Sequence, residues 1–94
     1  MIIERVELQV AEGKEEAFAT ILGDARKILS SADGCRSVAA ARGVENPSKF
    51  LLLLEWDSVG HHVAFTSTTR FGEFKALIGP SMGGPSSMEH FDTF

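Results

Sequence analysis

Two histidines and a tryptophan lie close together in the sequence. The histidines could do acid–base chemistry, and the tryptophan could hold an aromatic ring. An apolar run, Phe50 to Leu54, ends in Glu-Trp at Trp56, and His61 and His62 come after a short polar break. Imidazole titrates near neutral pH, so a histidine beside a dry pocket could accept a phenolic proton. An indole next to it could hold the substrate ring. We therefore predict a small-molecule pocket in which His62 is the base and Trp56 is a wall.

The same residues also have structural interpretations. Trp56 fits a core aromatic that caps a sheet with its indole N–H bonded nearby, and His62 fits a partly buried histidine with satisfied hydrogen bonds. His61 is turned about 100° from its neighbour on a helix, so we expect it to face solvent. No spacing of histidines, cysteines and carboxylates matches a metal site, and we expect no metal.

Apolar residues near Trp56 and along the following helix are expected to supply the dry wall of the pocket. The expected substrate-binding residues are Leu52, Leu54, Phe65, Phe71 and Phe74. A third histidine, His90, lies near the end of the chain between apolar residues. His90 could line the pocket or a subunit seam, and we expect it at the seam or on the surface.

The periodicity of the first half of the chain predicts a strand followed by a helix. Residues 2–10 alternate, and Glu4 interrupts an otherwise apolar face. Residues 14–31 then place apolar side chains at helical spacing, and Gly34 beyond them suits a left-handed turn. Gly23 lies inside this helix, and a close backbone contact there is one reason for a glycine.

The second half predicts a hairpin, a helix and a last strand. Residues 35–43 and 49–56 are the two strands of the hairpin, because a turn-forming segment separates them. Residues 59–78 form a helix with an inner face that includes Val59 and a break near residues 68–70. Residues 79–86 are a Gly/Pro loop, and residues 87–94 are a strand. This order predicts an α+β, ferredoxin-like βαββαβ fold: a four-stranded antiparallel sheet with both helices on one face.

Length and composition limit the class of protein. Ninety-four residues favour a single domain, 1–94. The net charge of −4, without a basic stripe, argues against nucleic acid as a partner. The longest apolar run is too short to cross a membrane, and Cys35 has no intrachain disulfide partner. No signal peptide is recognisable at the start of the chain, so we expect a cytoplasmic protein.

The strand at residues 49–56 is apolar on both sides. Leu51 and Leu53 face away from Trp56, so they would be exposed on a sheet with helices on one face only. A bare apolar sheet face usually marks an interface. We therefore predict a homodimer, and we expect Gly83 and Gly84 to act as a hinge that lets the last strand reach its sheet or the partner.

Three features follow one another along the chain: the Glu-Trp-Asp-Ser break at residues 55–58, the helix with Phe-Gly-Glu-Phe at 71–74, and the Gly-Pro loop before a short last strand. On these features rests a resemblance to the antibiotic biosynthesis monooxygenase family over nearly the whole chain. It implies a dimeric α/β barrel in which two ferredoxin-like sheets pack together. Some members oxidise polyketide or quinol substrates with molecular oxygen and no cofactor, and some relatives degrade haem.

The resemblance assigns roles position by position. Trp56 matches a tryptophan that the oxygenases use, whereas Leu52 replaces an asparagine and His62 replaces a tyrosine. An asparagine of the haem-degrading relatives falls on Val6 or Glu7, which makes haem the weaker expectation. The resemblance favours a small cofactor-independent monooxygenase acting on an aromatic or quinol-like substrate. A non-catalytic small-molecule-binding or stress-response dimer is the alternative.

Overall fold

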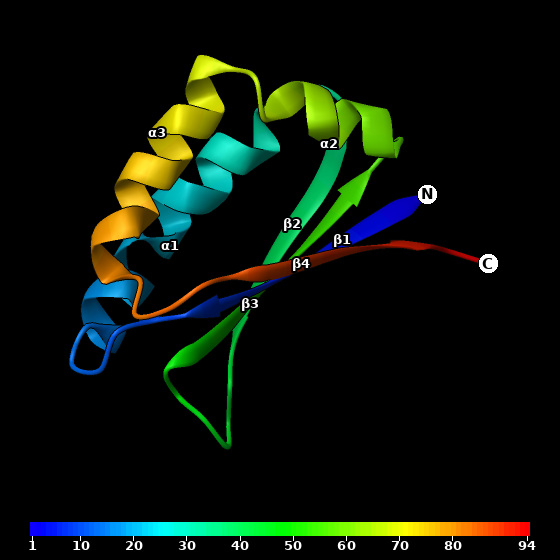
Figure 1. The fold of residues 1–94 in the computed structure, drawn as a ribbon. Coiled ribbons are helices and arrows are strands. Elements are labelled where there is room, and N and C mark those ends of the chain that lie inside the picture. The colour runs from blue at the N-terminus through cyan, green and yellow to red at the C-terminus, as the bar shows by residue number, and fades with distance from the viewer.

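The computed structural model describes residues 1–94 and has one antiparallel sheet with all helices on one face (Figure 1). The strands, in spatial order, are β2 (Cys35–Arg42), β3 (Lys49–Trp56), β1 (Ile2–Gln9) and β4 (Ser87–Asp92). The helices are α1 (Glu15–Ser30), α2 (Val59–Phe65) and α3 (Thr69–Ile78), followed by a short 3₁₀ turn, η1 (Gly79–Ser81). This arrangement confirms the predicted ferredoxin-like α+β fold, with the second helix divided into two.

The core lies between the sheet and the helices. Alternation along β3 turns four large side chains toward the helices, and each is at most 2% exposed: Phe50, Leu52, Leu54 and Trp56. They pack against the apolar stripe of α1, which buries Phe18, Ala25 and Leu29. On the other face of β3, Leu53 is 38% exposed, because no helix covers that side of the sheet. None of the helices has the length and apolar composition needed to span a bilayer.

The predicted helix break lies between α2 and α3. The Thr68 hydroxyl accepts a hydrogen bond from the backbone N–H of Phe71, so it caps α3 and starts a new helix direction. Helix α2 is only seven residues long and buries two side chains, His62 and Phe65. Val59, which we expected on the inner face, is 39% exposed, because the first turn of α2 lies outside the core.

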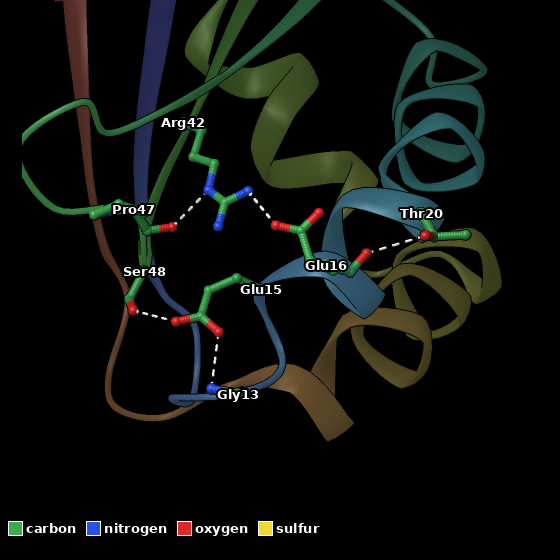
Figure 2. A network of polar contacts seen from close by, with 7 residues as sticks. All are labelled: Gly13, Glu15, Glu16, Thr20, Arg42, Pro47 and Ser48. Atoms are coloured by element: carbon green, nitrogen blue, oxygen red, sulfur yellow. Dashed lines mark hydrogen bonds and ion pairs between the residues drawn. The ribbon is translucent and has the colours of Figure 1, made fainter.

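Polar contacts fix the start of α1 to the β2–β3 hairpin (Figure 2). The carboxylate of Glu15 accepts hydrogen bonds from Gly13 N–H at 2.8 Å and from the Ser48 hydroxyl at 2.6 Å. The Ser48 bond is the main reason why the pKa of Glu15 is lowered. Arg42 donates to the Glu16 carboxylate and to the Pro47 carbonyl, both at 2.8 Å. These bonds orient α1 on the sheet.

The structure shows at which of three positions a glycine is required. Gly34 has a φ of +81°, as expected for a left-handed turn, and a Cβ there would lie 2.4 Å from the His61 ring. Gly23 has open space around it, so the expected close contact is absent. Gly83 donates to the Gln9 carbonyl at 2.8 Å, and a Cβ on it would lie 2.6 Å from the Ala11 Cα atom. Gly83 is therefore held against the end of β1, which corrects the hinge interpretation.

Replacing Gly34 with Ala is expected to lower the free energy of unfolding by more than about 1 kcal/mol. The new methyl group would strain the left-handed backbone and displace the His61 ring. Gly23→Ala is the matched control, and it should raise the stability by about 0.5–1 kcal/mol because that helical site is open. Urea denaturation measures both. Similar stabilities for the two variants would contradict the role given to Gly34.

Candidate functional site

A cavity of about 400 Å³ lies between the sheet and the helices, and most of its lining is apolar. The five predicted substrate-binding residues all lie at its wall: Leu52, Leu54, Phe65, Phe71 and Phe74. The strand residues come from the buried face of β3, and the phenylalanines from α2 and α3. All five residues therefore line one space, and their contact with a substrate stays a prediction.

The charged and titratable groups at the wall are Glu4, His62 and Lys75. Glu4 and His62 meet at one place, and both are buried, with exposed fractions of 6% and 7%. One carboxylate oxygen of Glu4, Oε2, lies 3.3 Å from Nε2 of His62. The other oxygen, Oε1, accepts a hydrogen bond of 2.9 Å from the indole Nε1 of Trp56. A substrate hydroxyl bound there would meet a carboxylate and an imidazole in an otherwise apolar space.

A second imidazole extends this group. Nε2 of His90 lies 2.8 Å from Nδ1 of His62, within hydrogen-bond distance. Strand β4 pairs with β1 so that His90 is directly opposite Glu4, and the two side chains share the helix-covered face. We had expected His90 at a subunit seam or on the surface. That expectation missed its contact with His62, because it did not include the register between the first and last strands.

Trp56 contacts Glu4 and His62 but does not line the cavity itself. It is fully buried, its ring centroid lies 5.2 Å from that of His62, and its N–H is bonded to Glu4. This position matches the structural interpretation of Trp56, a core aromatic with a bonded indole. The expectation that Trp56 holds the substrate ring is therefore replaced by a role in orienting Glu4 and His62.

Glu4 is the site residue that sequence reasoning missed. The sequence feature that could have identified Glu4 was a carboxylate on the apolar face of the first strand. A buried carboxylate is costly unless hydrogen bonds or charges compensate it, so such a residue predicts partners from elsewhere in the chain. Here the partners are Trp56 and His62, and both lie more than fifty residues away in the sequence.

Burial lowers the pKa of His62, while the charge of Glu4 raises it and His90 lowers it further. The ring is therefore neutral near pH 7, the form that can accept a proton. Glu4 and His90 contact opposite nitrogens of the ring, so the three side chains do not converge on one point. The structure contains no group of three His, Cys, Asp or Glu side chains arranged to hold a metal ion.

The stability of the protein is expected to fall as the pH drops from about 7 to about 5. The folded chain holds His62 with a pKa below the ordinary 6.5, so the unfolded chain binds the proton more tightly. This contribution is present above the unfolded pKa and is lost as the pH falls through the folded one. Melting temperatures measured across this range should show the decline, and His62→Gln should flatten it.

A wider pH range separates this effect from that of carboxylates. Glu15 and Asp57 also have lowered pKa values, but their ordinary values of 4.5 and 3.8 place their contributions at more acidic pH. A decline between pH 7 and 5 that is unchanged in His62→Gln would assign it to another group.

The fold and the cavity define a class: a ferredoxin-like α+β domain with an apolar pocket between its sheet and its helices. The chain belongs to the antibiotic biosynthesis monooxygenase family, whose family model matches residues 1–77. This finding confirms the resemblance seen in the sequence.

Several relatives match nearly the whole chain. A Bordetella bronchiseptica protein described as a candidate antibiotic biosynthesis monooxygenase has a crystal structure that is 30% identical, with a TM-score of 0.93. The match covers 99% of this chain and 96% of that one. The uncharacterised protein YczJ of Bacillus subtilis (strain 168) is 29% identical over 92 residues, 97% of each chain. A similar candidate from Nitrosomonas europaea shares the fold at 16% identity, with a TM-score of 0.84 and coverage of 99% and 98%.

Proposed function

We propose that this chain is a small cofactor-independent monooxygenase acting on an aromatic or quinol-like substrate. The observation that carries the proposal is the buried Glu4–His62 pair at the wall of an apolar cavity of about 400 Å³. The cavity is within the size range of small-molecule sites, and its phenylalanines suit a flat ring. Membership of the family adds oxygen chemistry as the reaction class.

The proposed reaction begins with the loss of a substrate proton. The imidazole pair His62–His90 accepts the proton of an ionisable hydroxyl, and His62 is the member at the wall. The resulting electron-rich anion reacts with molecular oxygen directly. The substrate supplies the electrons, one oxygen atom becomes a ring carbonyl, and the other leaves as water, which takes the hydrogen of the oxidised carbon and the proton that the imidazole pair returns. The apolar wall excludes bulk water and strengthens the electrostatic interactions inside.

A second function, binding without catalysis, is favoured by two features. Leu52 lines the cavity where the oxygenases of the family have an asparagine, and the chain contains no tyrosine. Haem binding is less well supported, because both nitrogens of His62 are near protein partners, which leaves neither directed at an iron.

We also propose that the protein is a homodimer. The sheet face that the helices leave bare carries Leu51, Leu53, Ile3 and Phe91. Phe91 is 46% exposed, and β4 forms an edge of the sheet with most of its side chains exposed. A second copy packed sheet to sheet would cover this face and form the dimeric barrel expected from the family.

Oxygen uptake with a panel of quinols and anthrones tests the enzyme directly. The enzyme should consume one oxygen molecule per substrate without added metal or flavin. Binding is measured separately through the fluorescence of Trp56, the only tryptophan, which lies next to His62. A compound that changes the fluorescence without any oxygen uptake across the panel would favour the binding function.

A further inference from the structure

Three titratable side chains form a line from the cavity toward the edge of the sheet. Glu4 of β1 contacts Nε2 of His62 at 3.3 Å, and Nδ1 of His62 contacts Nε2 of His90 at 2.8 Å. Glu4 and His62 are buried at the cavity wall, whereas His90 on the edge strand β4 is partly exposed. The line therefore joins a dry end to an end that water reaches.

Electrostatics determines where the protons lie in this line. A carboxylate favours a donor beside it, so Nε2 of His62 carries the hydrogen that faces Glu4. In a neutral imidazole the other nitrogen is then an acceptor. Nδ1 of His62 must accept its bond from an N–H at Nε2 of His90. The one free imidazole lone pair of the group is therefore on Nδ1 of His90.

We propose that Glu4, His62 and His90 bind and release one proton as a unit, with Nδ1 of His90 as the point of entry and exit. The step forms one N–H bond at Nδ1 of His90. The proton on its Nε2 can then move to Nδ1 of His62, which leaves the positive charge on the buried ring beside Glu4. One proton is gained, and no electrons are transferred. Glu4 is a positioning residue in this unit, because its carboxylate fixes the hydrogen on Nε2 of His62.

The unit can place a positive charge at the wall of the water-excluding cavity, and this use of it rests on the proposed function. When the proton is held, His62 is cationic at the wall, where it can stabilise an oxyanion left on the substrate. The neighbouring Glu4 carboxylate stabilises this positive charge at its buried position. Without Glu4, the buried cation would have no opposite charge in contact with it.

Other charged groups lie close to this line but do not form part of it. Lys75 of α3 is at the cavity wall, and it has no hydrogen bond to the three residues. Cys35 of β2 has a pKa raised by burial and, to a smaller extent, by the charge of Glu4. Trp56 of β3 is neutral and donates to Glu4. These groups contribute to the electrostatic potential around the line, but only Glu4, His62 and His90 form it.

Nitrogen-15 NMR of the histidine rings tests the unit without any substrate. Above the titration range, His62 and His90 should both carry their hydrogen on Nε2. On lowering the pH, both rings should respond at a shared midpoint, with the first change at Nδ1 of His90. His61 contacts neither ring in this line, so its signals serve as an internal reference.

Glu4→Gln should lower the midpoint of His62 and end the shared titration, because it removes the charge that favours the cationic ring. Glu7→Gln is the control, since it removes a carboxylate from the same strand on the other face. His90→Gln tests the line from its exposed end and should also shift the His62 midpoint.

A hydrogen on Nδ1 of His62, or two independent curves that neither variant shifts, would overturn the unit. The oxygenase could still operate with a separate base in that case. Conversely, a shared titration together with no oxygen uptake would support the proton-binding unit and contradict the proposed oxygenase.

Discussion

Replacing His62 with Gln is expected to lower the turnover of an accepted quinol by about 10²- to 10⁴-fold. Gln can still hydrogen-bond toward Glu4 and His90, but it cannot hold a proton at neutral pH. The loss should appear mainly in kcat, because the apolar wall that binds the ring is unchanged. Wild-type activity should rise with pH as the imidazole loses its proton, and the variant should lack this rise. Steady-state oxygen uptake across pH measures both.

His61→Gln is the matched control for this experiment. Its Nδ1 is 2.7 Å from the Ser58 hydroxyl, and the residue does not line the cavity. The side chain is partly buried over Gly34, so the expectation that it faces solvent was only partly correct. Turnover in this variant should stay within a few-fold of the wild type. Equal losses in the two variants would leave the reaction without His62 as its base.

Gln is a better probe than Ala, because His62 is part of the core. The structure shows a ring that is 7% exposed and packed against Trp56, so truncation would leave a void and an unpaired carboxylate. A fall in stability of His62→Ala therefore says nothing about catalysis. The comparison of His62→Gln with His61→Gln separates the two roles.

Periodicity predicted most of the fold, because β1, β3 and α1 each bury an apolar face. The alternation in residues 49–56 identified the central strand β3 and the side chains that reach the cavity. The helical spacing in residues 14–31 identified α1 with an error of one residue at each end. Even the division of the second helix was visible, because Thr68 is a capping residue within an apolar pattern. These signals are local, so a single sequence contains them.

The polar end of the site was not predictable in the same way. Its contacts join Glu4 to Trp56, 52 residues away, and His62 to His90, 28 residues away. They depend on how β1 pairs with both β3 and β4, and periodicity does not determine that register. Two irregular features pointed to it: an acidic residue on a dry strand face, and a histidine on the last strand. Considered together with the strand order of a ferredoxin-like sheet, they would have placed Glu4 and His90 on neighbouring strands, without fixing their register.

Replacing Leu53 with Asp is expected to convert the proposed dimer to a monomer or an aggregate. Leu53 lies near the middle of β3, on the sheet face that no helix covers, and is 38% exposed in the isolated chain. A sheet-to-sheet dimer would bury it against the partner, where an unpaired carboxylate is strongly unfavourable. Within one subunit, Asp at this position lies across from Arg5, so the monomer fold can accommodate it. Sedimentation velocity measures the change in association.

Val63→Asp is the matched control, because Val63 is an apolar side chain on α2 that is 57% exposed and lies on the helical layer. It should remain dimeric, since the proposed interface is on the opposite side of the sheet. Circular dichroism of both variants checks that the secondary structure is retained. If Leu53→Asp sediments as a dimer of normal stability, the subunits do not associate through this face. The bare side of the sheet would then need another explanation, and the barrel expected from the family would not apply to this chain.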